Sequence, residues 1–78
     1  MFVYILCKRN TNLLDKSSLE VFSTFDQAKT TCLEYLNERK LRSTNSGEET
    51  HDSYGRMYLY EDHIENEFVF IERCLVKS

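Results

Sequence analysis

The chain has 78 residues, 41% of them hydrophobic and 13% aromatic, and carries a net charge of −3 from 13 acidic and 10 basic side chains. This length predicts a single domain over residues 1–78, and the hydrophobic content predicts a folded chain with a small core. The acidic balance gives no long-range attraction for phosphate backbones or anionic lipid. It therefore disfavours nucleic acid and membrane surfaces as partners.

Two strands are predicted before the first helix. Residues 2–8 are apolar on both alternations, which is typical of an interior strand. A polar loop over 9–17 follows, and a second strand is expected at about 18–23. Thr24 and Gln27 then predict a capping box, in which the Thr24 hydroxyl accepts from the amide of Gln27 and the Gln27 side chain returns to the amide of Thr24. Ser23 with Asp26 is the alternative, which gives the same cap one residue earlier.

A helix is predicted from about residue 25 to 41, because apolar side chains recur there at spacings of three and four. Its buried stripe is expected to contain Phe25, Ala28, Cys32, Tyr35 and Leu36. Arg39, Lys40 and Arg42 are placed in its last turn, where positive charge complements the helix dipole. The polar and acidic stretch 43–53 has no apolar side chain and is expected to be a mobile loop.

Two more strands are predicted at about 56–61 and 67–75, joined by a hairpin loop. A helix over 57–67 is the alternative, but Met-Tyr-Leu-Tyr and Phe-Val-Phe-Ile are dense in residues that favour strands. The resulting order is ββαββ. We therefore expect an α+β domain, with a four-stranded, largely antiparallel sheet and one helix packed on one face.

Successive side chains of a strand point to opposite faces of a sheet, and in this chain the alternation separates aliphatic from aromatic residues. The aliphatic set contains Val3, Ile5, Cys7, Met57, Leu59, Val69 and Ile71. The other set contains Phe2, Tyr4, Leu6, Tyr58, Tyr60, Phe68 and Phe70. A single helix shields one face only, so we expect it against the aliphatic set and the aromatic set left uncovered.

An uncovered aromatic face predicts protein contact. A patch on the order of 600 to 800 Å² exceeds what a typical monomer exposes and matches one side of a standard interface. We expect a non-enzymatic interaction or structural module, a homodimer or a partner of another protein. The predicted interface anchors are Tyr4, Tyr58, Tyr60, Phe68 and Phe70. The alternative is that the terminal residues, a loop at Leu13 and Leu14, or residues 43–53 cover this face.

Single-stranded nucleic acid is the rival partner, since bases stack on aromatic sheet faces. Such a face is normally bordered by basic side chains. Here Glu61, Glu67 and Glu72 are interleaved on the same strands, so the electrostatic footprint is patchy and nucleic acid is disfavoured.

No dedicated chemistry is predicted. His51, Asp52 and Ser53 have the side-chain types of a hydrolase triad, but three consecutive residues cannot line up nucleophile, base and acid. We interpret them as solvated loop residues. His51, His63 and their acidic neighbours lack the spacing of zinc or calcium sites. We expect no catalytic residues, no metal, no cofactor and no enzymatic activity.

The three cysteines, Cys7, Cys32 and Cys74, are widely spaced and form no Cys-x-x-Cys pair. Each falls at a core or near-core position, where a thiol packs as a small hydrophobe. We expect reduced thiols and an intracellular protein, with a Cys7–Cys74 disulfide as the alternative if their strands are neighbours. The apolar run at 2–7 is too short to span a membrane, so no membrane association is expected.

The segment from Glu20 to Ala28 reads Glu-Val-Phe-Ser-Thr-Phe-Asp-Gln-Ala and follows a strand containing Val-Tyr-Ile-Leu at 3–6. Together they resemble the opening of small uncharacterised β-β-α-β proteins of phages, bacteria and large DNA viruses. The resemblance covers the first third of the chain and departs from the family at the acidic middle loop and the long last hairpin. It implies an accessory or virion-associated role, in the cytoplasm or the virion, and assigns no functional residues.

Overall fold

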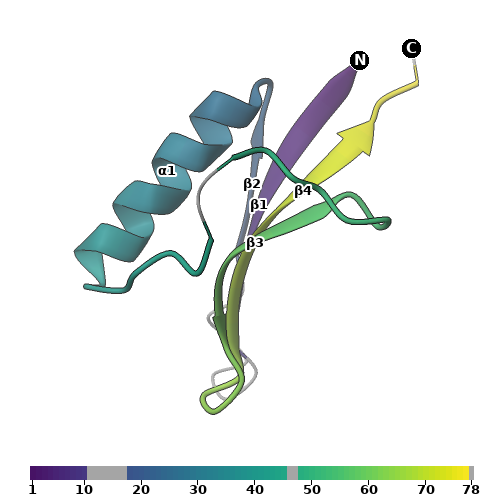
Figure 1. Cartoon of the computed structure of the whole chain (residues 1–78). Coiled ribbons are helices and arrows are strands. Elements are labelled where there is room, and N and C mark those ends of the chain that lie inside the picture. The colour runs from purple at the N-terminus through teal and green to yellow at the C-terminus, as the bar shows by residue number, and fades with distance from the viewer. Residues whose placement is uncertain (11–17, 46–47, 78) are drawn as a thin grey trace.

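The computed structural model describes residues 1–10, 18–45 and 48–77. Its elements are β1 (Phe2–Asn10), β2 (Ser18–Phe22), α1 (Phe25–Glu38), β3 (Arg56–Asp62) and β4 (Glu67–Leu75). The strands form one antiparallel sheet in the order β2-β1-β4-β3, and α1 lies across one side of it (Figure 1). The predicted α+β fold with one helix on a four-stranded sheet is confirmed. The predicted loop at 9–17 falls largely outside the described residues, and β1 continues through Asn10.

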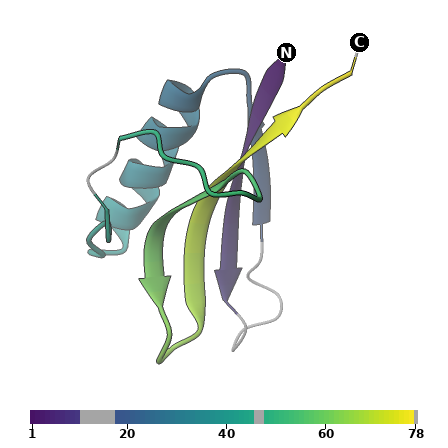
Figure 2. The same cartoon turned by 45° about the vertical axis from the view of Figure 1, so that its right-hand side comes forward.

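The first and last strands form the centre of the sheet. β1 pairs with β4 over nine residues, while β2 and β3 carry the two edges (Figure 2). Both alternations of β1 and β4 are rich in apolar side chains, although α1 packs on one face of the sheet only. Pairing β1 with β4 also brings the chain ends together, and the amide of Val76 donates to the carbonyl of Met1 at 2.8 Å.

The helix begins at the predicted cap. The amide of Gln27 donates to Thr24 Oγ1 at 3.2 Å. In place of the predicted hydrogen bond between the Gln27 side chain and the amide of Thr24, Gln27 Oε1 accepts a hydrogen bond from Ser23 Oγ at 3.2 Å. The helix ends at Glu38, three residues earlier than predicted. Arg39 is the C-cap, and Lys40 adopts a φ of 58°, in the left-handed region that ends helices. The prediction of Arg39, Lys40 and Arg42 in the last turn is therefore wrong.

The core lies between α1 and the sheet. It consists of Leu6, Ala28, Cys32, Leu36, Met57, Leu59, Val69 and Ile71. The helical members are the predicted ones, and Phe25 and Tyr35 pack at the margin of the cluster. Within the described ranges there is no helix that is long and apolar enough to cross a membrane.

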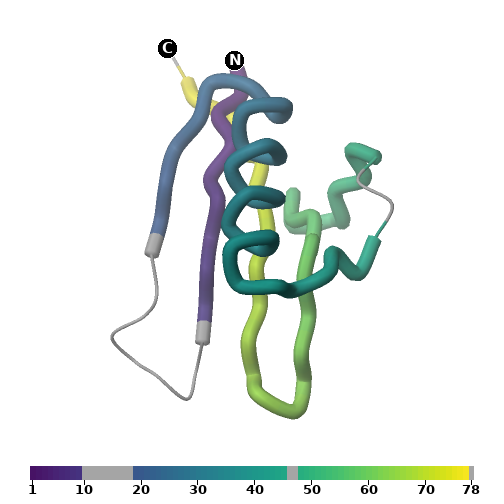
Figure 3. Tube along the Cα trace, turned by 90° about the vertical axis from the view of Figure 1, so that its left-hand side faces the viewer, coloured from purple at the N-terminus to yellow at the C-terminus, as the bar shows by residue number. Residues whose placement is uncertain are grey.

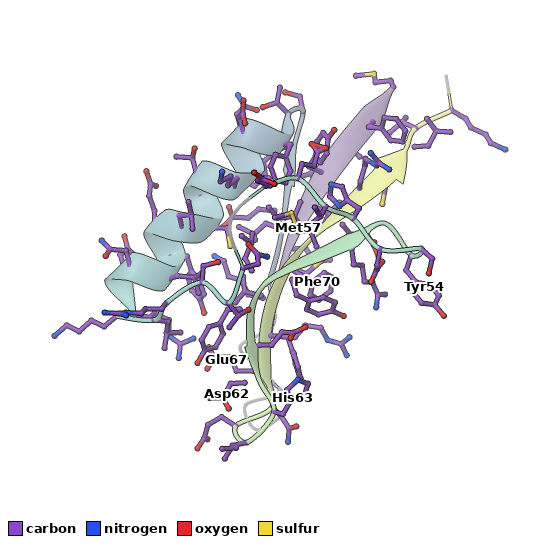
Figure 4. All side chains as sticks on the ribbon, viewed as in Figure 1. Tyr54, Met57, Asp62, His63, Glu67 and Phe70 are labelled. Atoms are coloured by element: carbon purple, nitrogen blue, oxygen red, sulfur yellow. The ribbon has the colours of Figure 1, made fainter. Side chains whose placement is uncertain are left out.

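Residues 41–45 and 48–55 connect α1 with β3. Figure 3 shows α1 in front of the middle of the sheet and this segment continuing on the β3 side. The amide of Thr44 donates to the carbonyl of Leu59 at 2.8 Å, and the Asn45 side-chain amide donates to the carbonyl of Tyr58. The segment is therefore attached to β3 through Thr44 and Asn45. His51 packs on the helix side against Tyr4 and Phe25, whereas Tyr54 lies on the side away from α1 (Figure 4).

A β-bulge in β3 changes the faces of the residues that follow it. Tyr58 is opposite Phe70 and Tyr60 is opposite Val69, so Leu59 is an extra residue between them. Leu59 and Tyr60 both turn towards the helix as a result, and Glu61 turns to the opposite face.

Candidate functional site: the uncovered sheet face

α1 packs on one side of the sheet and leaves the other side without a helix over it (Figure 1). We call it the uncovered face, and its register positions are Val3, Ile5, Cys7, Arg9, Leu19, Val21, Arg56, Tyr58, Glu61, Phe68, Phe70, Glu72 and Cys74. Figure 4 shows Phe70 on this side of the β3–β4 pair and Glu67 on the side of the helix. Of the residues 43–53 that were the alternative cover, Thr44 and Asn45 bond to β3 and His51 packs against Tyr4 and Phe25 on the helix side. Leu13 and Leu14 lie outside the described residues.

Three of the five predicted anchors meet on this face. The ring centroid of Tyr58 lies 5.0 Å from that of Phe70 and 6.3 Å from that of Phe68. The prediction of one shared aromatic face is wrong for the other two. Tyr4 packs on the helix side, 6.0 Å from the ring of Phe25, and Tyr60 packs against the core because of the bulge.

Tyr4 was misplaced because alternation within a strand does not say how neighbouring strands are aligned. In the observed register Leu6 lies opposite Ile71 and Cys7 opposite Phe70. The aromatic alternation of β1 therefore shares the helix side with the aliphatic alternation of β4. The predicted packing of the helix against a purely aliphatic face is wrong for the same reason.

The aliphatic side chains of β1 and β2 consequently lie on the uncovered face. Leu19 is 71% exposed and Val21 is 64% exposed, beside Cys7 and Ile5 respectively. The prediction did not include these positions among the anchors. No signal in the sequence fixes the β1–β2 register, since their loop is long and polar. The face is thus aliphatic over β2 and β1 and aromatic over β4 and β3.

The charges on the face are few and partly paired. Arg56 Nε donates to Glu72 Oε1 at 2.9 Å, and this hydrogen bond raises the pKa of Arg56. The Arg56 guanidinium also lies 5.2 Å from the Phe70 ring centroid, which helps to leave Phe70 only 4% exposed. Arg9 makes no ion pair with any described residue and lines a hollow of about 220 Å³ with Tyr58 and Phe68.

The thiols of this face are poor nucleophiles. Burial, followed by the nearby Glu72 carboxylate, raises the pKa of Cys7 and of Cys74. Both thiols therefore stay protonated at neutral pH. All three cysteines are free. The alternative Cys7–Cys74 disulfide is not formed, because Cys7 lies opposite Phe70 and Cys74 opposite Val3.

The suspected triad residues lie elsewhere and do not form a catalytic arrangement. The prediction of a solvated His51 is wrong: its side chain is 2% exposed, with ring centroids 6.2 Å from Tyr4 and 5.8 Å from Phe25. Neither ring nitrogen has a hydrogen-bond partner among the described residues. Nε2 lies 3.6 Å from Glu49 Oε2, outside hydrogen-bond distance, and the Tyr4 and Phe25 rings supply apolar contact.

Asp52 organises a turn. Its Oδ1 accepts hydrogen bonds from the amide of Tyr54 at 2.8 Å and the amide of Arg56 at 3.0 Å. The bond from Arg56 contributes most to a lowered pKa of Asp52. Across the parts of the chain that the structure describes, no three His, Cys, Asp or Glu side chains gather as metal ligands.

Comparisons with models of known families, with curated proteins and with solved structures find no match for this chain. Its function is therefore argued from the uncovered face alone.

Proposed function

We propose that this chain is a non-enzymatic protein-interaction or structural module that self-associates through the uncovered face. The observation that supports this most directly is the exposure of Leu19 and Val21, at 71% and 64%, continuous with the Tyr58–Phe68–Phe70 cluster. Burying such a surface is favourable at about 25 cal/mol per Å² of apolar area. A second copy presents the same apolar surface, so it satisfies the requirement without another partner.

The size of the face sets the expected strength. Four strands about 4.8 Å apart and six residues at about 3.4 Å outline a surface of roughly 400 Å². This is about half of one side of a standard interface, which is about 800 Å² per partner. It is also smaller than the sequence predicts, because Phe70 and Cys7 are already shielded by their neighbours. We expect a concentration-dependent dimer with a dissociation constant in the micromolar range.

The proposed location and role have separate support. An intracellular location is supported by the three free thiols, which are typical of reducing compartments. An accessory or virion-associated role in a virus is supported only by the resemblance of the first third of the chain.

The decisive experiment measures the mass of the purified chain by sedimentation equilibrium over a wide concentration range. Val21→Lys is the test variant, because it introduces a charge on the uncovered face at a residue that is 64% exposed. Ile64→Lys is the matched control, since Ile64 is 89% exposed in the turn between β3 and β4. We expect the parent and Ile64→Lys to dimerise with equal affinity and Val21→Lys to stay monomeric.

A parent chain that stays monomeric at millimolar concentration would contradict the proposal. Titration of labelled single strands at two salt concentrations tests the rival partner, for which Arg9 beside Tyr58 and Phe68 is the available contact. Salt-dependent binding by a monomeric chain, abolished in Arg9→Ala, would replace self-association with nucleic-acid binding.

A further inference from the structure

The two edge strands of the sheet differ in how they are protected. Three backbone carbonyls of β3 accept hydrogen bonds from the connector between α1 and β3. The donors are the amide of Thr44, the side chain of Asn45 and the amide of Asp52. The bulge at Leu59 also interrupts β3. Native proteins cover or interrupt edge strands in this way, because an open row of backbone donors and acceptors pairs readily with another strand.

β2 has none of these protections within the described part of the chain. It pairs with β1 over five consecutive residues without a bulge, and no described residue outside β1 makes a backbone hydrogen bond to it. β2 contains no proline, and the carboxylate of Glu20, its one charged side chain, lies 3.4 Å from Lys8 Nζ of β1. Figure 3 shows β2 at the margin of the sheet opposite β3. β2 is therefore an open edge that can accept a further strand.

A groove lies between the end of β2 and α1. Its described lining residues are Phe22, Asp26, Gln27, Thr30, Thr31 and Glu34. The charged groups in this lining are the carboxylates of Asp26 and Glu34, and neither forms an ion pair with a described residue. Glu20 turns to the same side of the sheet, because it lies opposite the core residue Leu6. The helix side of the open edge therefore attracts cations.

The other side of the same edge is apolar. Leu19 and Val21 point to the uncovered face and are 71% and 64% exposed. An added strand would also point successive side chains to opposite faces. Its residues beside Leu19 and Val21 would meet apolar groups, and the residues between them would lie on the side of Asp26 and Glu34. The edge therefore favours a strand in which apolar and basic residues alternate.

We propose that β2 binds an extended peptide in which basic and apolar residues alternate, and that this peptide becomes a fifth strand of the sheet. Five residues, such as Lys-Val-Lys-Val-Lys, match the length of β2. The outer lysines of such a strand are about 13 Å apart. Asp26 and Glu34 are about 12 Å apart along the helix axis. α1 begins three residues after β2 ends and runs back alongside the strands, so the two spacings are aligned (Figure 3).

A second copy of this chain is a less favourable occupant of the edge. Pairing β2 with β2 of another copy would place both helices on the same face of a joined sheet. The carboxylates of Asp26 and Glu34 from the two copies would then face one another without a counter-charge. A basic peptide supplies that counter-charge. The inference does not depend on self-association, since a single chain presents the same edge.

Fluorescence anisotropy of a labelled Lys-Val-Lys-Val-Lys peptide, blocked at both ends, tests this pairing with the full chain. We expect a dissociation constant on the order of 100 μM. Lys-Lys-Lys-Val-Val has the same composition and charge without the alternation, and it should bind at least about tenfold more weakly. Methylation of alternate backbone nitrogens separates pairing from charge, because only one alternate set of peptide amides faces β2. Methylation of that set should abolish binding, whereas methylation of the other set should change the affinity less than about threefold.

Charge reversal in the chain tests the groove. Glu34→Lys is the test variant and Glu48→Lys the matched control, because both residues are exposed and each change takes the net charge from −3 to −1. Glu48 lies in the connector before β3 and does not line the groove. We expect Glu34→Lys to weaken peptide binding about tenfold and Glu48→Lys to change it less than about twofold. Circular dichroism checks that both variants keep the fold.

Amide chemical shifts locate the bound peptide. In an NMR titration the amides of β2 should shift, and those of β3 should not. Shifts confined to Tyr58, Phe68 and Phe70 would place the peptide on the uncovered face and overturn the inference. Equal binding of the non-alternating peptide, equal effects of the two methylated sets, equal weakening by the two variants, or no binding at millimolar peptide would also overturn it. A monomeric chain that binds the peptide at β2 would support this inference and contradict the proposed self-association alone.

Discussion

Gly55 is the position where one added methyl group should disturb the sheet most. Its φ is +77°, in the region that L-residues rarely adopt, and it precedes β3 directly. A Cβ built there would lie 2.8 Å from the carbonyl oxygen of Arg73, which is backbone and cannot rotate away. Gly55 O also accepts a hydrogen bond from the amide of Arg73 at 2.6 Å, so any separation weakens this contact between β4 and the start of β3.

The expected loss for Gly55→Ala follows from these terms. Left-handed backbone costs an L-residue about 1 to 2 kcal/mol, and a weakened backbone hydrogen bond about 1 kcal/mol. Alanine also lowers the conformational entropy of the unfolded chain, which offsets about 0.4 to 1 kcal/mol of this loss in unfolding free energy. The net is about 2 kcal/mol of unfolding free energy. For a domain of this size it lowers Tm by roughly 8 to 16 °C.

Thermal unfolding followed by circular dichroism measures this loss. Lys40→Gly is the opposite control, because Lys40 has a φ of 58° just after the end of α1, where glycine is favoured. It should raise the unfolding free energy by about 0.5 to 1 kcal/mol. A Gly55→Ala chain that melts within about 2 °C of the parent would refute the strain argument.

Three further outcomes follow from buried or hydrogen-bonded groups. His51→Leu should leave the unfolding free energy unchanged or raise it by about 1 kcal/mol, because it removes two unbonded ring nitrogens. His51→Ala should lower the unfolding free energy by about 1 to 2 kcal/mol. Equal losses for the two variants in urea unfolding would contradict this expectation. Burial raises the pKa of Cys32 to about 12, so iodoacetamide at pH 8 should label Cys74 first and Cys32 only on unfolding, as read by mass spectrometry. The turn at Asp52 should persist above the ordinary Asp pKa of about 3.9 and be lost as the pH falls through its lowered pKa in the folded chain. An NMR titration of the Tyr54 and Arg56 amides should give a midpoint below about 3.9, and a midpoint at or above it would be against the assignment.

The elements of this fold were predictable because each has a local cause. The Thr24 cap and the three- and four-residue spacing locate α1, and dense β-branched and aromatic runs locate β1, β3 and β4. The early end of α1 was not predictable in this way. It depends on the left-handed backbone conformation of Lys40, and a lysine in the sequence does not predict this conformation.

The composition of the site was only half predictable, because it depends on relations between strands. Tyr58, Phe68 and Phe70 were placed correctly together, since β3 and β4 are joined by a short hairpin. Tyr4 depends on the long-range register between β1 and β4, and Tyr60 on a bulge that adds one residue to β3. A period of two contains neither piece of information.

The pairing of β1 with β4 also has a consequence for how the chain acquires its structure. The middle of the sheet joins segments that are as many as 73 residues apart, from Phe2 to Leu75. During synthesis β1, which has apolar side chains on both of its faces, therefore cannot pair with β4 until β4 has emerged from the ribosome. The centre of the sheet should accordingly form only when β4 is available to pair with β1.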